Sequence, residues 1–121
     1  MIVELQSFGH KYGPPPAADL VFDARVLPNP HWVEELRPHS GREPLIAAYV
    51  LENSAGRDFL TLHLNLLRFL LEHSRAGGRG FLRVAVGCTG GRHRSVAVSE
   101  ALASALADLV PVNLTHRDIE K

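Results

Sequence analysis

The sequence has a single cysteine and no excess of either charge, and both features limit what the chain can do. Cys88 is the only cysteine in 121 residues, so no disulfide forms within the chain. A lone thiol is typical of a reducing compartment, and we expect a cytoplasmic protein without a structural zinc site or other metal. The 13 Lys and Arg residues balance 13 Asp and Glu residues, so the overall charge attracts neither nucleic acid nor membrane. Any anion binding must come from a local cluster.

Long apolar runs, repeats and targeting signals are also missing. No stretch has the roughly 18 uncharged apolar residues of a membrane span, and no signal peptide is expected. Apolar residues nevertheless make up 45% of the chain, which is enough for one hydrophobic core. We therefore expect residues 1–121 to form one domain.

Apolar patterning predicts four strands, at residues 2–8, 20–26, 81–87 and 111–116. Helices are predicted at residues 45–53, 59–75 and 92–109, with Asp58 as the cap of the second. The third helix is expected to bury Val98, Leu102, Ala105, Leu106 and Leu109. These elements predict an α/β fold with a mainly parallel sheet of about four strands flanked by helices. The link between the first two strands is compatible with a hairpin or a wide crossover.

The loop after the third strand carries the strongest functional signal. It combines two glycines, two arginines, a histidine, two hydroxyl groups and the cysteine: Cys88, Thr89, Gly90, Gly91, Arg92, His93, Arg94 and Ser95. The glycines allow backbone N–H groups to converge, and the following helix adds the positive end of its dipole. Arginine can meet an oxyanion with two hydrogen bonds. The loop is therefore predicted to bind a phosphate-like anion, although a tight turn with solvated arginines is the simpler reading.

The same loop is similar to the Cys-x-x-Gly-x-x-Arg-Ser signature of cysteine-dependent phosphatases. In those enzymes the cysteine attacks phosphorus and the arginine holds the phosphoryl oxygens, which here would be Cys88 and Arg94. Asp23 and Asp118 are the candidates for the general acid. Gly87 departs from the pattern, because the phosphatases usually carry histidine there. Catalysis is therefore an alternative to simple binding.

Further polar clusters follow the other predicted strands. If the strands are parallel, these clusters meet the 88–95 loop at the carboxyl edge of the sheet, where ligands bind in open α/β folds. We read Trp32 as a packing anchor of its loop. The predicted pocket residues are Ser7, Gly9, Lys11, Tyr12, Arg25, Asn29, His31, His116 and Arg117.

Four of these segments together resemble the C-terminal domain of the RNase adapter protein RapZ family. They are residues 7–13, 23–32, 87–95 and 116–121, in the family's order, so the resemblance covers nearly the whole chain. His10 departs from it, since an aromatic residue is expected between Gly9 and Lys11. The Gly-x-x-x-x-Gly-Lys-Ser/Thr loop of the family's nucleotide-binding domain does not occur in this sequence, so no nucleotide cofactor is expected.

The resemblance implies a regulatory domain that recognises a phosphorylated metabolite, an amino sugar phosphate such as glucosamine-6-phosphate. It also implies a small regulatory RNA or a protein as a partner, without a membrane, and leaves a homo-oligomer open. The residues alone leave a phosphatase and an RNA-binding module as alternatives. RNA binding needs an extended basic surface, for which the neutral chain offers only a local patch.

Overall fold

A computed structural model describes residues 1–121 and contains one sheet of four strands. The strands are β1 (Ile2–Gly9), β2 (Leu20–Asp23), β3 (Phe81–Cys88) and β4 (Val112–His116). All pairings are parallel, in the order β2-β3-β1-β4, which confirms the predicted α/β class with a parallel sheet. Since β3 lies between β1 and β2, the link between these two strands is a crossover and not a hairpin. Most of the apolar β3 is buried because it is a central strand.

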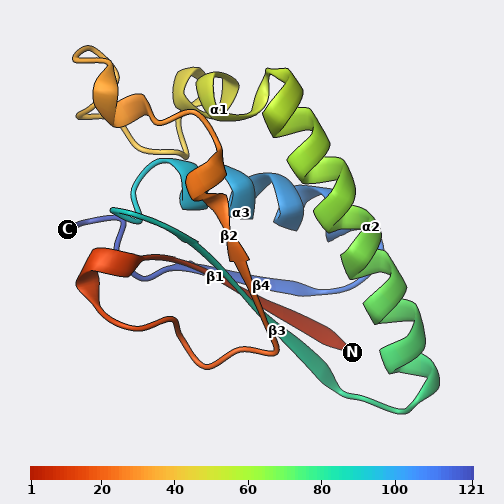
Figure 1. Ribbon diagram of the computed structural model, residues 1–121. Coiled ribbons are helices and arrows are strands. Elements are labelled where there is room, and N and C mark those ends of the chain that lie inside the picture. The colour runs from red at the N-terminus through yellow and green to blue at the C-terminus, as the bar shows by residue number, and fades with distance from the viewer.

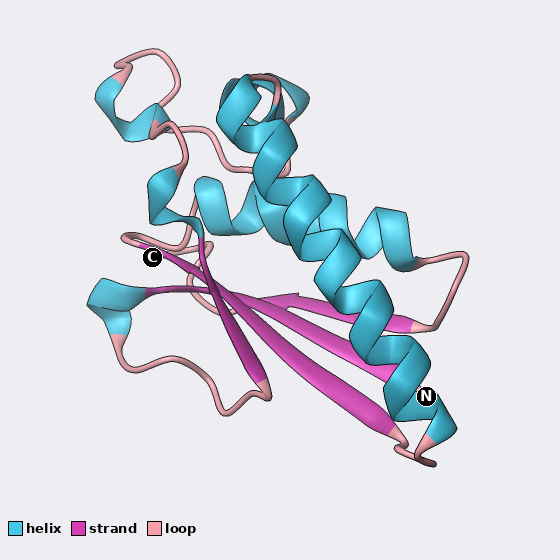
Figure 2. Cartoon of the chain, turned by 45° about the vertical axis from the view of Figure 1, so that its right-hand side comes forward, coloured by secondary structure: helices cyan, strands magenta, loops and turns pink.

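Three helices lie together on one face of this sheet (Figures 1 and 2). They are α1 (Pro44–Leu51), α2 (Ser54–Ala76) and α3 (Arg94–Leu106). Three short 3-10 turns join the elements: η1 (His10–Tyr12), η2 (Ala24–Val26) and η3 (Pro30–Trp32). None of the helices has both the length and the hydropathy needed to cross a membrane.

The hydrophobic core lies between the sheet and the helices. Side chains alternate along the strands, so Val3 and Leu5 of β1 face the same way as their β3 partners Leu82 and Val84, and all four are buried. Leu102 of α3 completes this layer at 0% exposure. The other face carries no α-helix (Figure 2), and it presents polar side chains such as Glu4 and Arg83 beside exposed apolar ones such as Val21 and Phe81. The helices therefore cover one face of the sheet, and the loops lie at its carboxyl edge (Figure 1).

Several predicted boundaries were wrong for local physical reasons. The helix predicted at 59–75 begins at Ser54, because the Asn53 side chain accepts a hydrogen bond of 2.8 Å from the Gly56 N–H and is the cap in place of Asp58. The strand predicted at 20–26 ends at Asp23, where η2 begins. The helix predicted at 92–109 spans Arg94–Leu106, and Leu109 beyond its end is 47% exposed, not buried.

Parallel pairing brings the polar loops to one edge of the sheet. The carboxyl ends of β1, β2 and β3 lie on the same side, together with η1, η2 and the turn that leads into α3 (Figure 1). The C-terminus of the chain also lies there. The clusters expected to gather at this edge therefore do so.

Candidate functional site

The loop between β3 and α3 is positioned by close backbone contact with the end of β1. Gly91 has a positive φ of 76°, which favours glycine. A Cβ atom on Gly91 would lie 2.5 Å from the Gly9 nitrogen, and one on Gly9 would lie 2.4 Å from the Gly90 carbonyl carbon. The two segments can approach this closely only without side chains, so both glycines are needed to hold the loop against β1.

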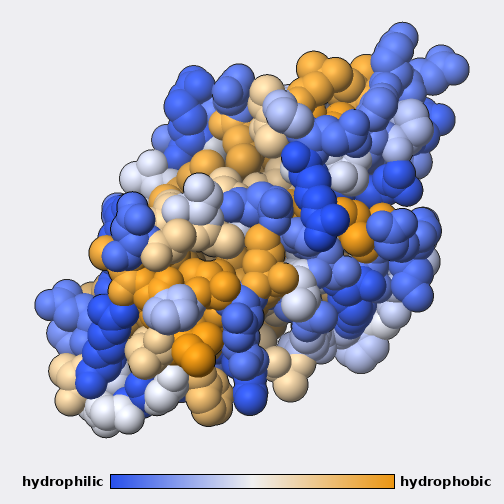
Figure 3. All heavy atoms as spheres, turned by 180° about the vertical axis from the view of Figure 1, so that it is seen from behind, coloured by the Kyte–Doolittle hydropathy of each residue, from blue (hydrophilic) through white to orange (hydrophobic).

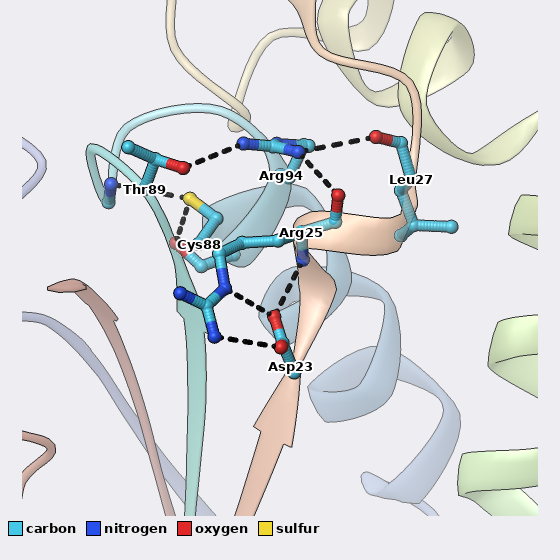
Figure 4. A network of polar contacts seen from close by, with 8 residues as sticks. Asp23, Arg25, Leu27, Cys88, Thr89 and Arg94 are labelled. Carbon is cyan, nitrogen blue, oxygen red and sulfur yellow. Dashed lines mark hydrogen bonds and ion pairs between the residues drawn. The ribbon is translucent and has the colours of Figure 1, made fainter.

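Cys88 lies below this loop and not in its open part. Its residue is 2% exposed, and its Sγ accepts a hydrogen bond of 3.2 Å from the Gly91 N–H. The thiol donates to the Ser95 Oγ at 3.1 Å (Figure 4). Ser95 is completely buried, so it supports the cysteine and does not face a ligand.

Arg94, the first residue of α3, connects the loop to the segment after β2 (Figure 4). Its guanidinium donates to the Arg25 carbonyl at 2.8 Å, to the Leu27 carbonyl at 3.4 Å and to the Thr89 Oγ1 at 3.3 Å. The residue is only 6% exposed. All of its partners are neutral, so its buried charge has no carboxylate beside it.

A cleft of about 390 Å³ opens above the loop and is lined by 14 residues. Eleven of them were predicted from the sequence: Lys11, Tyr12, Asn29, His31 and the seven consecutive residues from Cys88 to Arg94. The structure therefore brings loops from three strand ends together around one hollow. Three lining residues were missed: Trp32, Arg37 and Lys121.

The lining of this cleft is cationic. It contains five Lys and Arg residues and no Asp or Glu, although the whole chain is neutral. None of the five takes part in an ion pair: they are Lys11, Arg37, Arg92, Arg94 and Lys121.

Neutral groups hold these cations in place. Arg37 donates to the His31 carbonyl at 2.8 Å, and Arg92 donates to the carbonyls of Pro38 and His39. The ammonium groups of Lys11 and Lys121 lie 5.1 and 5.8 Å from the centre of the Tyr12 ring. Carbonyls and aromatic rings orient a cation without cancelling its charge. The cleft therefore keeps a positive potential for a ligand.

His93 lies between the loop and α3 and is held in one tautomer. Its Nε2 donates to the Arg37 carbonyl at 3.0 Å, so this nitrogen carries the proton. Burial lowers the pKa of His93 below its ordinary value of 6.5, and the neighbouring Arg92 acts in the same direction. His93 is therefore a neutral donor near pH 7, and the charge of the cleft comes from lysine and arginine.

Six predicted site residues lie outside the lining of the cleft. His116 is held between the Ser7 Oγ at 2.6 Å and the Glu100 carboxylate at 3.1 Å, with its side chain 1% exposed. It joins β1, β4 and α3 and is not placed to touch a ligand in the cleft. The others are Ser7, Gly9 and Ser95, which are buried, and Arg25 and Arg117, which pair with carboxylates.

The two carboxylates considered as general acids are both engaged. Asp23 accepts two hydrogen bonds of 2.9 Å from the Arg25 guanidinium, and this contact lowers the pKa of Asp23 below 3.8. Asp118 is buried and accepts hydrogen bonds from the Gly9 N–H at 2.7 Å and from Arg117 at 3.0 Å. The lowered pKa of Asp23 makes this residue a poor proton donor to a leaving group, and the Asp118 carboxylate is occupied by its two hydrogen-bond partners.

Trp32 differs most from its expected role. It was read as a packing anchor, but it is 77% exposed and lies in the wall of the cleft. The neighbouring Pro30 is buried and anchors this turn instead. The one sequence signal for the exposure of Trp32 is its position directly after His31, which was predicted as a pocket residue.

The molecule has two other hollows, and their chemistry differs. One of about 270 Å³ lies on the uncovered face of the sheet and includes the Glu4–Arg83 ion pair, whose charges cancel. The other lies beside the end of α2 and is lined by only five residues, Leu109 among them. Figure 3 shows an apolar area on the side of the molecule where α2 lies. Neither hollow collects unpaired cations as the cleft does.

Comparisons with known proteins agree on one family. A family model described as the RapZ C-terminal domain matches residues 1–120. The chain is 50% identical over 119 residues to a nucleotide-binding protein of Mycobacteroides abscessus and 54% identical over 114 residues to one of Frankia alni. It is 52% identical over 120 residues to a nucleotide-binding protein of Trichlorobacter lovleyi. These alignments cover 97%, 93% and 98% of this chain but only 40%, 39% and 42% of the relatives.

Proposed function

The chain belongs to the family of RapZ C-terminal domains, and from this premise we propose that it is a regulatory binding domain whose cleft takes a phosphorylated small molecule. The resemblance indicates an amino sugar phosphate such as glucosamine-6-phosphate. One observation carries the proposal: five Lys and Arg side chains line one cleft, none has an ion-pair partner, and no Asp or Glu is among the lining residues.

The backbone adds hydrogen-bond donors to these charges. The N–H groups of Arg92, His93 and Arg94 have no acceptor within the protein. They precede or begin α3, whose positive dipole end favours an anion at the same place. A phosphoryl group bound there would receive backbone hydrogen bonds and charge compensation together.

The size of the cleft favours a small ligand. Ligand pockets typically have volumes of about 300–1,000 Å³, and this cleft of about 390 Å³ is at the lower end. Asn29 and His31, which belong to the lining but not to the loop, can contact the part of the ligand beyond the phosphate. Their turn is fixed, because the Asn29 Oδ1 accepts a hydrogen bond of 3.1 Å from the His31 N–H.

RNA binding has less support from the same geometry. Arg79 and Arg83 lie outside the cleft, and they pair with Asp19 and Glu4. Their charges are therefore compensated, and the unpaired cations are concentrated in one cleft. An extended row of free charges, which backbone phosphates require, is not formed along the sheet.

Phosphatase chemistry also has less support. Cys88 is buried. The two candidate general acids, Asp23 and Asp118, are hydrogen-bonded to Arg25 and Arg117. The histidine that phosphatases carry before the cysteine has no room here, because a Cβ on Gly87 would lie 2.5 Å from the Phe8 ring and 2.7 Å from the His10 Nε2. We therefore assign Cys88 to the wall of the binding site.

Calorimetric titration with glucosamine-6-phosphate tests the proposal. Lys11→Gln removes an exposed cation from the rim and is expected to weaken binding about tenfold, with the difference shrinking at high salt. Arg57→Gln is the matched control, because Arg57 is exposed, unpaired and outside the cleft. Arg94→Ala should abolish binding. Absence of heat from the unmutated protein with any sugar phosphate would refute the proposal.

A further inference from the structure

Trp32 is a large apolar side chain that the fold leaves in solvent beside the cationic cleft. It is the only tryptophan of the chain, and it is 77% exposed. Its ring contacts the His31 ring edge to face, with the ring centres 5.3 Å apart. Both side chains belong to the lining of the cleft. A ligand that enters the cleft therefore meets an aromatic surface as well as cations.

The exposure of Trp32 is built into a well-fixed turn. The Trp32 N–H donates to the Asn29 carbonyl at 3.2 Å, and the Arg37 guanidinium holds the His31 carbonyl at 2.8 Å. The intervening Pro30 is buried and restricts the backbone. Two hydrogen bonds and one buried proline thus hold the turn that presents the indole, so little ordering is needed when a ligand arrives.

The other aromatic residue of the cleft is already occupied. Tyr12 has the ammonium groups of Lys11 and Lys121 over its ring, at 5.1 and 5.8 Å from the centre. Tyr12 therefore orients two cations, whereas no cation lies over the Trp32 ring. Trp32 is the aromatic side chain of the cleft that remains available for a ligand.

We propose that Trp32 is a specificity-determining residue that stacks on the sugar ring of a ligand whose phosphate is held by the 88–94 loop. This inference rests on the proposed function and deepens it by assigning the side chain that recognises the sugar ring. The cations attract any phosphate, so they cannot distinguish one phosphorylated compound from another. A pyranose has an apolar C–H face that an exposed indole can cover, whereas inorganic phosphate and glycerol 3-phosphate have no ring to stack.

Titration of four phosphate compounds separates the two parts of the site. The compounds are inorganic phosphate, glycerol 3-phosphate, glucose 6-phosphate and glucosamine-6-phosphate. Trp32→Ala is expected to weaken binding of the two sugar phosphates about tenfold, as loss of an aromatic stack does, and to leave the two acyclic compounds unchanged. Trp32→Phe should restore most of the affinity. Phe69→Ala is the matched control, because Phe69 is 57% exposed and lies outside the cleft.

Intrinsic fluorescence gives a second readout, because Trp32 is the only tryptophan and all tryptophan emission comes from it. Saturating glucose 6-phosphate should shift the emission to shorter wavelength, and saturating inorganic phosphate should not. If all four compounds bind and Trp32→Ala weakens all or none of them, the inference is wrong while the proposed function stands. If none of them binds the unmutated protein, the proposed function itself has failed. Tighter Trp32-dependent binding of AMP than of either sugar phosphate would overturn the assignment to a sugar ring.

Discussion

Gly9→Ala is the substitution that best tests how the cleft is built. Gly9 ends β1, where its N–H donates to the buried Asp118 at 2.7 Å and its strand position is paired with Cys88. A methyl group there would lie 2.4 and 2.6 Å from the carbon and oxygen of Gly90 and 2.7 Å from the Gly91 nitrogen. All three atoms belong to the backbone, so no side-chain rotation relieves the overlap.

The size of the effect follows from these distances. Non-bonded carbon atoms normally lie about 3.5–4.0 Å apart, so the 90–91 turn has to retreat by roughly 1 Å. Overpacking of this kind costs about 1–3 kcal/mol, which corresponds to a fall in Tm of roughly 4–12 °C for a domain of this size. The same movement displaces the N–H groups before α3. We therefore expect affinity for glucosamine-6-phosphate to fall about tenfold or more.

Gly80→Ala is the matched control, because a Cβ there has no neighbour within 4 Å. Gly90→Ala is a second control for stability alone, because a Cβ there also meets nothing within 4 Å while the residue itself lines the cleft. Thermal unfolding followed by circular dichroism gives the stabilities, and calorimetry gives the affinities. If Gly9→Ala is as stable as Gly80→Ala and binds as well, the close contact between β1 and the loop is not what positions the site.

Three further outcomes are expected. Burial lowers the pKa of His116 below 6.5, so the unfolded chain binds a proton at this residue at a higher pH than the folded chain does. The free energy of unfolding, measured in urea, should therefore fall as pH drops from about 7.5 to 5.5. His116→Gln should flatten this fall. Asn53→Ala should destabilise by about 1 kcal/mol and Asp58→Ala by less than about 0.5 kcal/mol, measured the same way. Wild-type and Cys88→Ser proteins should show equal, background release of p-nitrophenol from p-nitrophenyl phosphate, and Cys88-dependent turnover would contradict our assignment.

The location of the cleft could be predicted because its signals are local. A buried strand predicted at 81–87, followed by Cys88, two glycines and a helix, indicates the loop without knowledge of the rest of the chain. Parallel pairing then follows from the alternation of strands and helices, and it brings the segments around Lys11 and His31 to the same edge. These inferences need only periodicity and the rules of parallel sheets.

The partners of individual side chains could not be predicted in this way. His116 looked like a pocket residue because it ends a strand at the correct edge, but its ring points to Ser7 and Glu100, which are distant in sequence. Trp32 was predicted to be a packing anchor of its loop because tryptophan is large and apolar, and only the arrangement of its turn exposes it. Arg37 lies in the lining of the cleft, where its guanidinium donates to the His31 carbonyl. Specific contacts decide these positions, with distant segments for His116 and within the 29–37 segment for Trp32 and Arg37, and the residue pattern alone does not show them.

Arg94 shows why the charges of the cleft are better explained by a ligand than by folding alone. Its guanidinium ties η2 to α3 through the carbonyls of Arg25 and Leu27, a role that a neutral donor could also fill. A buried charge without an opposite partner destabilises a protein unless something compensates it. The sequence elsewhere supplies such partners, as Asp23 does for Arg25 and Asp118 does for Arg117. The Lys and Arg residues of the cleft have no carboxylate partner, and a bound phosphate would supply the missing negative charge.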